Sequence, residues 1–434
     1  MKDYRSVIEL LESRKAAELF TRLYGGCESA TQDQILRYKH LTAQYVKLFN
    51  GEDIRLFSSS GRTEIGGNHT DHNGGWVLSA GVHLDSIAAV SKTDSNLIRV
   101  YSEGYSRPFN VDINRLDPKK DERGTTSALI RGVAARFKEL GYKSGGFNAF
   151  ISSKVGVGSG LSSSASIEVL LGTILNILYN EGTIPKLKIA KIGQYAENVY
   201  FDKPCGLMDQ ITCAFGGVIS IDFSDFDFPT ISSINFNFSD TGYTLLVVDT
   251  GTGHADLGED YAAIPREMKS ISTLLGKRTC RGITLRELEK NIAFLRSKAS
   301  DRAVLRAYHF ITENERVKKE VKALKDGDFD GFLTLVNQSG SSSFKWLQNS
   351  FSTKNPHRQG ITLALLLTKH FLSRRAYGAC RVHGGGFAGT IQAFIPDGYL
   401  KEYVTFMESI FGVHSVTLLS VRPYGALYLN PLII

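Results

Sequence analysis

The chain has no apolar run of about 18 residues, so the sequence predicts no membrane-spanning helix. Its first twenty residues are amphipathic and charged, and they lack the apolar core of a signal peptide. Cysteine is scarce, odd in number and without the spacing of a zinc site; the five positions are 27, 205, 213, 280 and 380. Unpaired, scattered cysteines fit a reducing compartment, and we expect a cytoplasmic protein that has no membrane partner.

Two common phosphate-binding loops are also absent. No GxxxxGK[ST] motif occurs, and the single GxGxxG match, Gly384–Gly389, is followed by TIQAFIP, which predicts a strand where a dinucleotide fingerprint needs a helix. The net charge of +7 and the pI near 9.0 favour anionic ligands. Because the basic residues are dispersed and form no basic–aromatic stripe, nucleic acid is not predicted as a partner.

What is present is a glycine- and serine-rich stretch, GVGSGLSSSAS, at Gly156–Ser166. The alternating segment 147–153 before it predicts a strand, and the apolar residues of 167–178 recur at helical spacing. A glycine loop that opens a helix directs backbone N–H groups and the positive helix terminus at an anion, here a phosphate chain. The simpler alternative is a flexible surface linker. The predicted nucleotide-binding residues are Gly156, Gly158, Gly160, Leu161, Ser162, Ser163, Ser164 and Ala165.

Periodicity predicts an α+β chain in which helices are segregated from strands. We expect two helices in 4–49 separated near Gly25, a polar glycine-rich loop over 56–78, and one strand or a strand pair over 77–90. One helix is predicted for 186–201, and CGLMDQ is placed in the turn after it.

Four motifs, taken together, identify a family. GRTEIGGNHTDHNGG, GVGSGLSSSAS, CGLMDQ and RVHGGGFAG follow one another between about residues 62 and 389. In sequence and order they resemble the galactokinase family of GHMP small-molecule kinases, of which the chain looks like a divergent, bacterial-type member. The resemblance implies a two-lobed α+β fold with mixed sheets and an active site between the lobes. Residues 1–231 would form the N-terminal lobe, including a helical extension over 1–50, and residues 232–434 the C-terminal lobe.

The resemblance also implies an ATP-dependent sugar 1-kinase that uses Mg²⁺, with α-D-galactose as the expected substrate. Arg62 would lie beside the transferred phosphoryl group, where an always-charged, forked donor suits the transition state. Asp209 would accept or orient the proton of the sugar hydroxyl. Ser164 and Glu197 would bind the metal through hard oxygen atoms. Without the resemblance, a surface ion pair, a turn aspartate and a solvated helix glutamate would be the simpler interpretations.

For the sugar, the resemblance implies contacts from the segment GRTEIGGNHTDHNGG, residues 61–75, here called the signature loop, and from two later segments. The residues are Asn68, His69, Asp71, Gly206 and Tyr261. The simpler interpretation of the tyrosine is core packing. The spacing of His69 and His72 would also allow a zinc pair, but no third ligand is near in sequence.

Three residues depart from the family pattern: Asn68 stands where Glu is usual, Glu64 where Asn is usual, and His72 where Tyr is usual. In the family the Glu contacts the C6 hydroxyl of the sugar. A neutral amide can donate as well as accept a hydrogen bond, so Asn68 would tolerate a C6 carboxylate or a pentose. Galacturonate, arabinose and N-acetylgalactosamine therefore stay open as alternative substrates, as does a non-catalytic sugar- and ATP-binding sensor. We expect a monomer or a weak homodimer.

Overall fold

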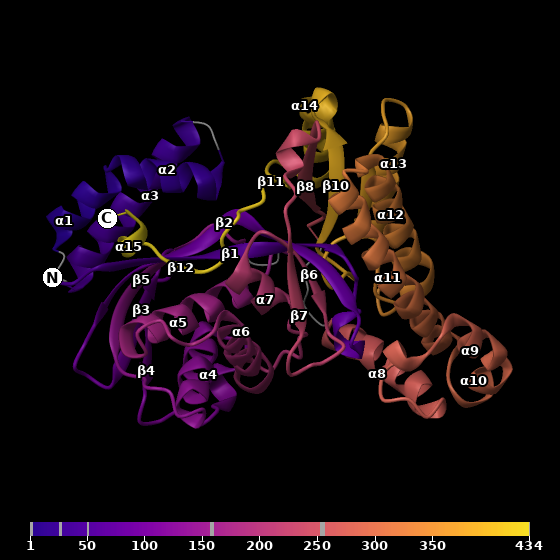
Figure 1. Cartoon of the computed structure of the whole chain (residues 1–434), viewed down its shortest axis with the longest axis horizontal. Coiled ribbons are helices and arrows are strands. Elements are labelled where there is room, and N and C mark those ends of the chain that lie inside the picture. Colours follow the sequence, from indigo (N-terminus) through magenta and orange to yellow (C-terminus); the bar gives the residue numbers. More distant parts are fainter. Residues whose placement is uncertain (1–2, 26–27, 50–51, 157–159, 252–256, 434) are drawn as a thin grey trace.

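A computed structural model describes residues 3–25, 28–49, 52–156, 160–251 and 257–433. It contains an eight-stranded sheet, a separate four-stranded sheet, and helices against both (Figure 1). Within the described ranges no helix is both long and apolar enough to cross a bilayer.

The larger sheet has the strand order β12-β1-β2-β5-β3-β4, with β6 paired to β2 and β7 paired to β6. Only β3 and β5 run parallel among these pairs. The strands are β1 (Arg55–Gly66), β2 (Trp76–Lys92), β3 (Leu97–Ser102), β4 (Phe109–Asp112), β5 (Phe147–Ser153), β6 (Val218–Asp222), β7 (Thr230–Ile234) and β12 (Leu427–Tyr428).

Helices cover both faces of this sheet, because successive side chains of a strand point to opposite sides. Ala88 and Val90 of β2 pack in the core beneath α4–α7, whereas Ile87 and Ala89 pack against α1–α3. Figure 1 shows the two helical layers above and below the strands. The helices are α1 (Tyr4–Leu11), α2 (Arg14–Tyr24), α3 (Glu28–Phe49), α4 (Thr126–Glu139), α5 (Ser163–Tyr179), α6 (Lys186–Tyr195) and α7 (Met208–Phe215).

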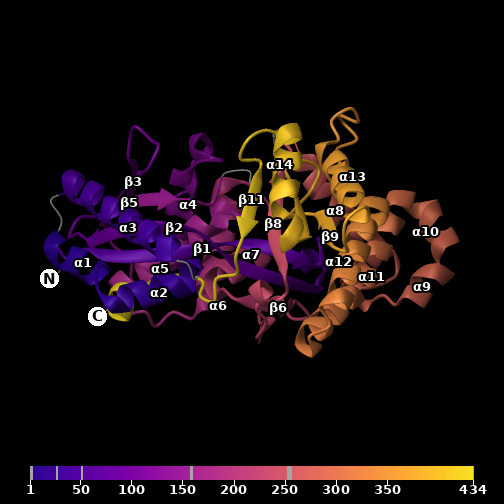
Figure 2. The ribbon, with the colours of Figure 1, turned by 90° about the horizontal axis from the view of Figure 1, so that it is seen from above.

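The smaller sheet is entirely antiparallel, in the order β11-β8-β10-β9. Leu246 and Val248 face one helical layer, which includes α13 and α14, and Leu245 and Val247 face the core that includes α11 and α12. Its elements are β8 (Tyr243–Asp249), β9 (Ala379–Val382), β10 (Thr390–Pro396), β11 (Val416–Leu419), α11 (Asp301–Asp326), α12 (Phe329–Ser342), α13 (Gly360–Ser373) and α14 (Leu400–Phe411). Helix α8 (Gly258–Leu274) packs against α11, and helices α9 (Leu285–Lys290) and α10 (Ile292–Lys298) form the end of the molecule opposite the termini (Figure 2).

The end of the chain returns to the larger sheet. Strand β12 pairs with β1, and the side chain of Asn430, in α15 (Asn430–Ile433), bonds the backbone of Ile54 and Leu56. The two termini consequently lie at the same end of the molecule in both views. The division at residues 231 and 232 stays a prediction, but the last few residues belong spatially with the first sheet.

Three predicted elements were wrong. The first 49 residues hold three described helices, because Ser13 caps a new helix by accepting a hydrogen bond from Ala16 N–H. Much of the predicted loop 56–78 is strand β1, whose small polar residues are buried between helices and sheet. The predicted helix 186–201 ends at Tyr195 and continues as a π-helical turn, Ala196–Phe201.

Candidate active site

Arg62 and Asp209 form a bidentate ion pair at the centre of the molecule. Arg62 lies on β1 and Asp209 in the first turn of α7; Nε is 2.6 Å from Oδ1 and Nη2 is 2.8 Å from Oδ2. Burial alone would raise the pKa of Asp209, but the charge and the hydrogen bonds of Arg62 hold that pKa below its ordinary value. The carboxylate is therefore ionised near neutral pH, as a proton acceptor must be.

The described part of the glycine- and serine-rich loop touches this pair directly. The Arg62 side chain donates to the carbonyl of Gly160, its backbone N–H donates to the carbonyl of Leu161 at 3.1 Å, and Ser162 Oγ donates to Asp209. Gly160 has φ +73°, and a Cβ there would overlap Thr390, so this position requires glycine. The loop opens a helix as predicted, with α5 starting at Ser163, while Gly158 lies outside the described residues.

The start of α5 is fixed by a buried residue of the same loop. Ser166 Oγ bonds the Ser59 carbonyl and Ser86 Oγ, each at 2.9 Å. Leu161 and Ala165 are buried, and Ser163 and Ser164 are partly exposed. The predicted nucleotide-binding segment thus ends on a fixed helix N-terminus whose serine side chains remain accessible.

Ser164 and Glu197, the predicted metal ligands, are in contact. Ser164 Oγ donates to Glu197 Oε1 at 2.8 Å, and Lys203 Nζ lies 2.9 Å from the same oxygen. Gln210 Nε2 bonds the other oxygen of Glu197 at 2.9 Å and Glu168 at 3.0 Å. A hydroxyl and a carboxylate are oxygen donors of the kind that Mg²⁺ prefers. In the part of the chain that is described, no group of three or more His, Cys, Asp or Glu residues is arranged to bind a metal.

The predicted sugar residues gather around the glycine-rich segment 384–389, here called the third glycine motif. His69 Nε2 lies 2.9 Å from the Gly385 carbonyl, and the Tyr261 hydroxyl donates to the Gly386 carbonyl at 3.0 Å. Burial lowers the pKa of His69 to about 3, so this ring is neutral near pH 7. A Cβ at Gly206 would overlap the Asp71 carboxylate, which places these two residues in contact.

Asn68 faces the protein interior. It is fully buried; its Nδ2 donates to Glu64 Oε1 at 2.9 Å and to the Gly384 carbonyl at 2.7 Å, and its Oδ1 accepts from Asn349 at 2.7 Å. Glu64 in turn forms a buried ion pair with Arg381 at 2.7 Å. A direct contact between the Asn68 amide and a sugar would therefore require the amide to leave one of these partners.

Two residues of α11 that sequence reasoning missed hold the backbone of the signature loop. Glu313 Oε1 accepts from Gly67 N–H at 3.1 Å, and His309 Nε2 lies 3.0 Å from the Asn68 carbonyl. Both side chains are fully buried. They stand four residues apart on a helix whose apolar residues recur at helical spacing, so polar residues on its buried face were the available signal.

We expect acid to destabilise the fold through Glu313. Burial opposes ionisation, but Arg316, His309 and Arg381 lower the Glu313 pKa from 4.5 to about 2. Because the folded pKa is depressed, this stabilisation is complete above the unfolded pKa of 4.5 and is lost as the pH falls toward 2, by about 3 kcal/mol. Urea unfolding from roughly pH 5 down to pH 2 measures the loss. Glu313→Gln should reduce its slope, and an unchanged slope would contradict the assignment.

Comparisons with known proteins show which family the chain resembles. Residues 43–92 match the galactokinase galactose-binding signature and residues 128–217 the N-terminal domain of GHMP kinases. The chain is 30% identical to a galactokinase of Streptomyces coelicolor over 372 residues, which is 85% of this chain and 91% of that protein. It is 29% identical to a galactokinase of Clostridium acetobutylicum over 85% and 92% of the two chains.

Solved structures share the fold. The crystal structure of Lactococcus lactis galactokinase complexed with galactose matches with a TM-score of 0.78 at 22% identity, over 90% of this chain and 100% of that one. The mevalonate kinase of Methanococcus jannaschii matches with a TM-score of 0.59 at 16% identity, over 84% and 98%. The identity to the Streptomyces protein over most of both chains, together with the two domain matches, shows that this chain belongs to the galactokinase family of GHMP kinases.

Proposed function

We propose that the protein transfers the γ-phosphoryl group of ATP to the C1 hydroxyl of α-D-galactose, which gives α-D-galactose 1-phosphate and ADP. The bidentate Arg62–Asp209 pair, in contact with Gly160 and Ser162, is the observation that carries this proposal. It places a fixed cation and an ionised carboxylate against the loop that would hold the phosphates. These are the two groups that phosphoryl transfer to an alcohol requires.

In the reaction, a bond forms between the sugar O1 and the γ-phosphorus while the bond from that phosphorus to the β,γ-bridging oxygen breaks. Asp209 takes or orients the O1 proton, and Arg62 stabilises the charge on the transferred group. The backbone N–H groups at the start of α5, with Ser162 and Ser163, would bind the phosphates. Ser164 and Glu197 would hold Mg²⁺, which neutralises phosphate charge when bound. An enzyme that consumes ATP is expected in the cytoplasm. We expect this one to act as a monomer or a weak homodimer.

Sugar recognition is assigned to the loop 68–71 with Gly206 and Tyr261. Asp71 lies against Gly206, and His69 and Tyr261 both bond the glycine motif. Because Asn68 is neutral, a kinase of galacturonate or of another related sugar is the second candidate function.

A coupled ADP-release assay with ATP and magnesium tests the function. The panel is galactose, galacturonate, arabinose, N-acetylgalactosamine and glucose, and we expect the highest kcat/KM with galactose. Preference for another sugar would keep the chemistry and change the substrate. Nucleotide binding with no sugar-dependent ADP on any of them would replace the kinase by a non-catalytic sensor.

A further inference from the structure

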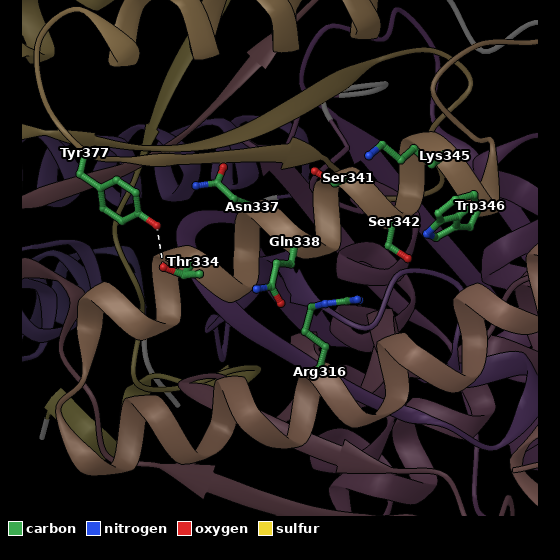
Figure 3. A pocket seen from close by; sticks show the side chains of 9 residues that line it. All are labelled: Arg316, Thr334, Asn337, Gln338, Ser341, Ser342, Lys345, Trp346 and Tyr377. Carbon is green, nitrogen blue, oxygen red and sulfur yellow. Dashed lines mark hydrogen bonds between the residues drawn. The ribbon is translucent and has the colours of Figure 1, made fainter. Parts of the chain in front are cut away.

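A hollow lies between α11 and α12, and neither Arg62 nor Asp209 lines it. It has a volume of about 440 Å³. Figure 3 shows Arg316 and Gln338 reaching into the space between the two helices, with Lys345 and Trp346 at one end and Tyr377 at the other. We call this hollow the α11–α12 groove. It shares no residue with the proposed catalytic, nucleotide or sugar residues.

The chemistry of the groove favours an anion. Two of its nine lining residues, Arg316 and Lys345, are cationic, and none of the nine is an aspartate or glutamate. Arg316 bonds Glu313 through Nη1 alone among the described contacts, so the rest of its donor fork stays available to a ligand. Lys345 is exposed and forms no ion pair within the described ranges.

The other lining residues suit a hydroxylated ring. Gln338 and Ser341 offer neutral donors and acceptors beside the cations. Trp346 is 36% exposed and is held edge-to-face by Tyr308, at 5.9 Å between ring centroids, so its ring is fixed at the rim. A rigid aromatic surface next to two cations and neutral polar groups is the combination that a phosphorylated sugar needs.

The groove is connected to the sugar loop by two short chains of hydrogen bonds. Arg316 is the ion-pair partner of Glu313, which accepts from Gly67 N–H. Ser342, a lining residue, bonds His309 Nδ1 at 2.9 Å, and the opposite ring nitrogen lies at the Asn68 carbonyl. A ligand that takes part of the Arg316 charge weakens the compensation of buried Glu313, and hence the bond that fixes Gly67.

From these contacts we infer that the α11–α12 groove binds a hexose monophosphate, and that its occupation lowers the affinity of the enzyme for its sugar substrate. The regulatory half of this inference rests on the proposed kinase function; the binding half does not. The effect is on sugar affinity because both hydrogen-bond chains end on the backbone of the signature loop and not on the phosphate loop.

Glucose 6-phosphate is the probe, followed by calorimetry and by tryptophan fluorescence on the full chain. We expect binding to the wild type, at least tenfold weaker binding to Lys345→Glu, and unchanged binding to the matched control Lys319→Glu on the outer side of α11. Trp346→Phe should remove the fluorescence change. With ATP analogue and sugar both saturating, the probe should still bind, but more weakly by the same severalfold factor by which it lowers sugar affinity, because the coupling is reciprocal. Three results would overturn the assignment. They are equal binding of the probe to both lysine variants, complete displacement of the probe by the active-site ligands, and an affinity for inorganic phosphate or for glucose equal to that for the probe.

The kinetic arm measures the two Michaelis constants separately. Glucose 6-phosphate should raise the sugar KM severalfold in the wild type and in Lys319→Glu, with the ATP KM unchanged, and should have no effect on Lys345→Glu. An unchanged sugar KM at saturating probe would overturn the regulatory half. Absence of sugar-dependent ADP release without the probe would refute the proposed function instead, and calorimetry would still decide whether the groove binds.

Discussion

Replacing Asp209 by Asn is expected to lower kcat by about 10²- to 10⁴-fold, the usual contribution of a positioned general base. The substitution keeps the size of the side chain and removes its charge. In the wild type, both carboxylate oxygens accept from Arg62. An amide offers one acceptor and turns its NH₂ group toward the guanidinium, so the proton acceptor and the position of Arg62 are lost together.

The matched control for this prediction is Ser162→Ala. Ser162 donates to the same carboxylate and is a proposed phosphate-binding side chain, so its removal should raise the ATP KM but leaves the charge and the Arg62 pair in place and should cost far less kcat. ADP release measures kcat, and calorimetry with an ATP analogue and thermal unfolding establish that both variants are folded and bind nucleotide. An Asp209→Asn enzyme that keeps more than about a tenth of wild-type kcat would remove Asp209 from the role of base.

The sequence predicted which residues meet at the candidate site better than it predicted the helices and strands that hold them. Arg62, Asp209 and the loop at Gly160–Ser162 were singled out from motifs, and the fold brings them into contact. Periodicity could not show that pairing, since the residues lie on a strand, a helix and a loop far apart in the chain. The motif resemblance could, because it assigns Arg62 to the transferred phosphoryl group and Asp209 to the sugar hydroxyl that attacks it.

The elements around the site were harder to predict for identifiable physical reasons. Ser58, Ser59 and Ser60 made β1 look like a loop, yet they are buried, and Ser58 bonds Asp85 at 2.5 Å. Helix α12 was not predicted, because its serines and glycines have low helix propensity. Its Gly340 packs where a Cβ would lie 2.8 Å from the Cys380 carbonyl, so tertiary packing decides the conformation.

Glu64 and Asn68 depart from the family pattern at two separate positions of the sequence, and in the structure their side chains are in contact. Their side chains hydrogen-bond at 2.9 Å. The family pattern has a carboxylate at position 68 and an amide at position 64, so this chain holds the same two groups at exchanged positions within one buried cluster. Arg381, which is fully buried, holds the carboxylate in its present position. Position 68 is therefore neutral in this chain while Arg381 keeps a negatively charged partner in Glu64.

Glu64→Asn should destabilise the protein by about 3–5 kcal/mol, because it leaves the Arg381 guanidinium buried without its counter-charge. Asn68→Glu should also be strongly destabilising, because it sets a second carboxylate against Glu64 and removes the donor to the Gly384 carbonyl. The double variant restores one carboxylate and one amide to the cluster. We expect it to recover about 1–3 kcal/mol relative to the sum of the single changes.

Urea unfolding of the four proteins measures this coupling, and kcat/KM for galactose and galacturonate gives an independent measurement. A carboxylate at position 68 accepts a hydrogen bond from a C6 hydroxyl and repels a C6 carboxylate, so the double variant should shift the ratio toward galactose. Strictly additive unfolding energies would show that Glu64 and Asn68 do not act as an exchanged pair. A recovered fold with an unchanged sugar ratio would leave the exchange structural and move C6 recognition to other residues of the loop, His69 and Asp71 first.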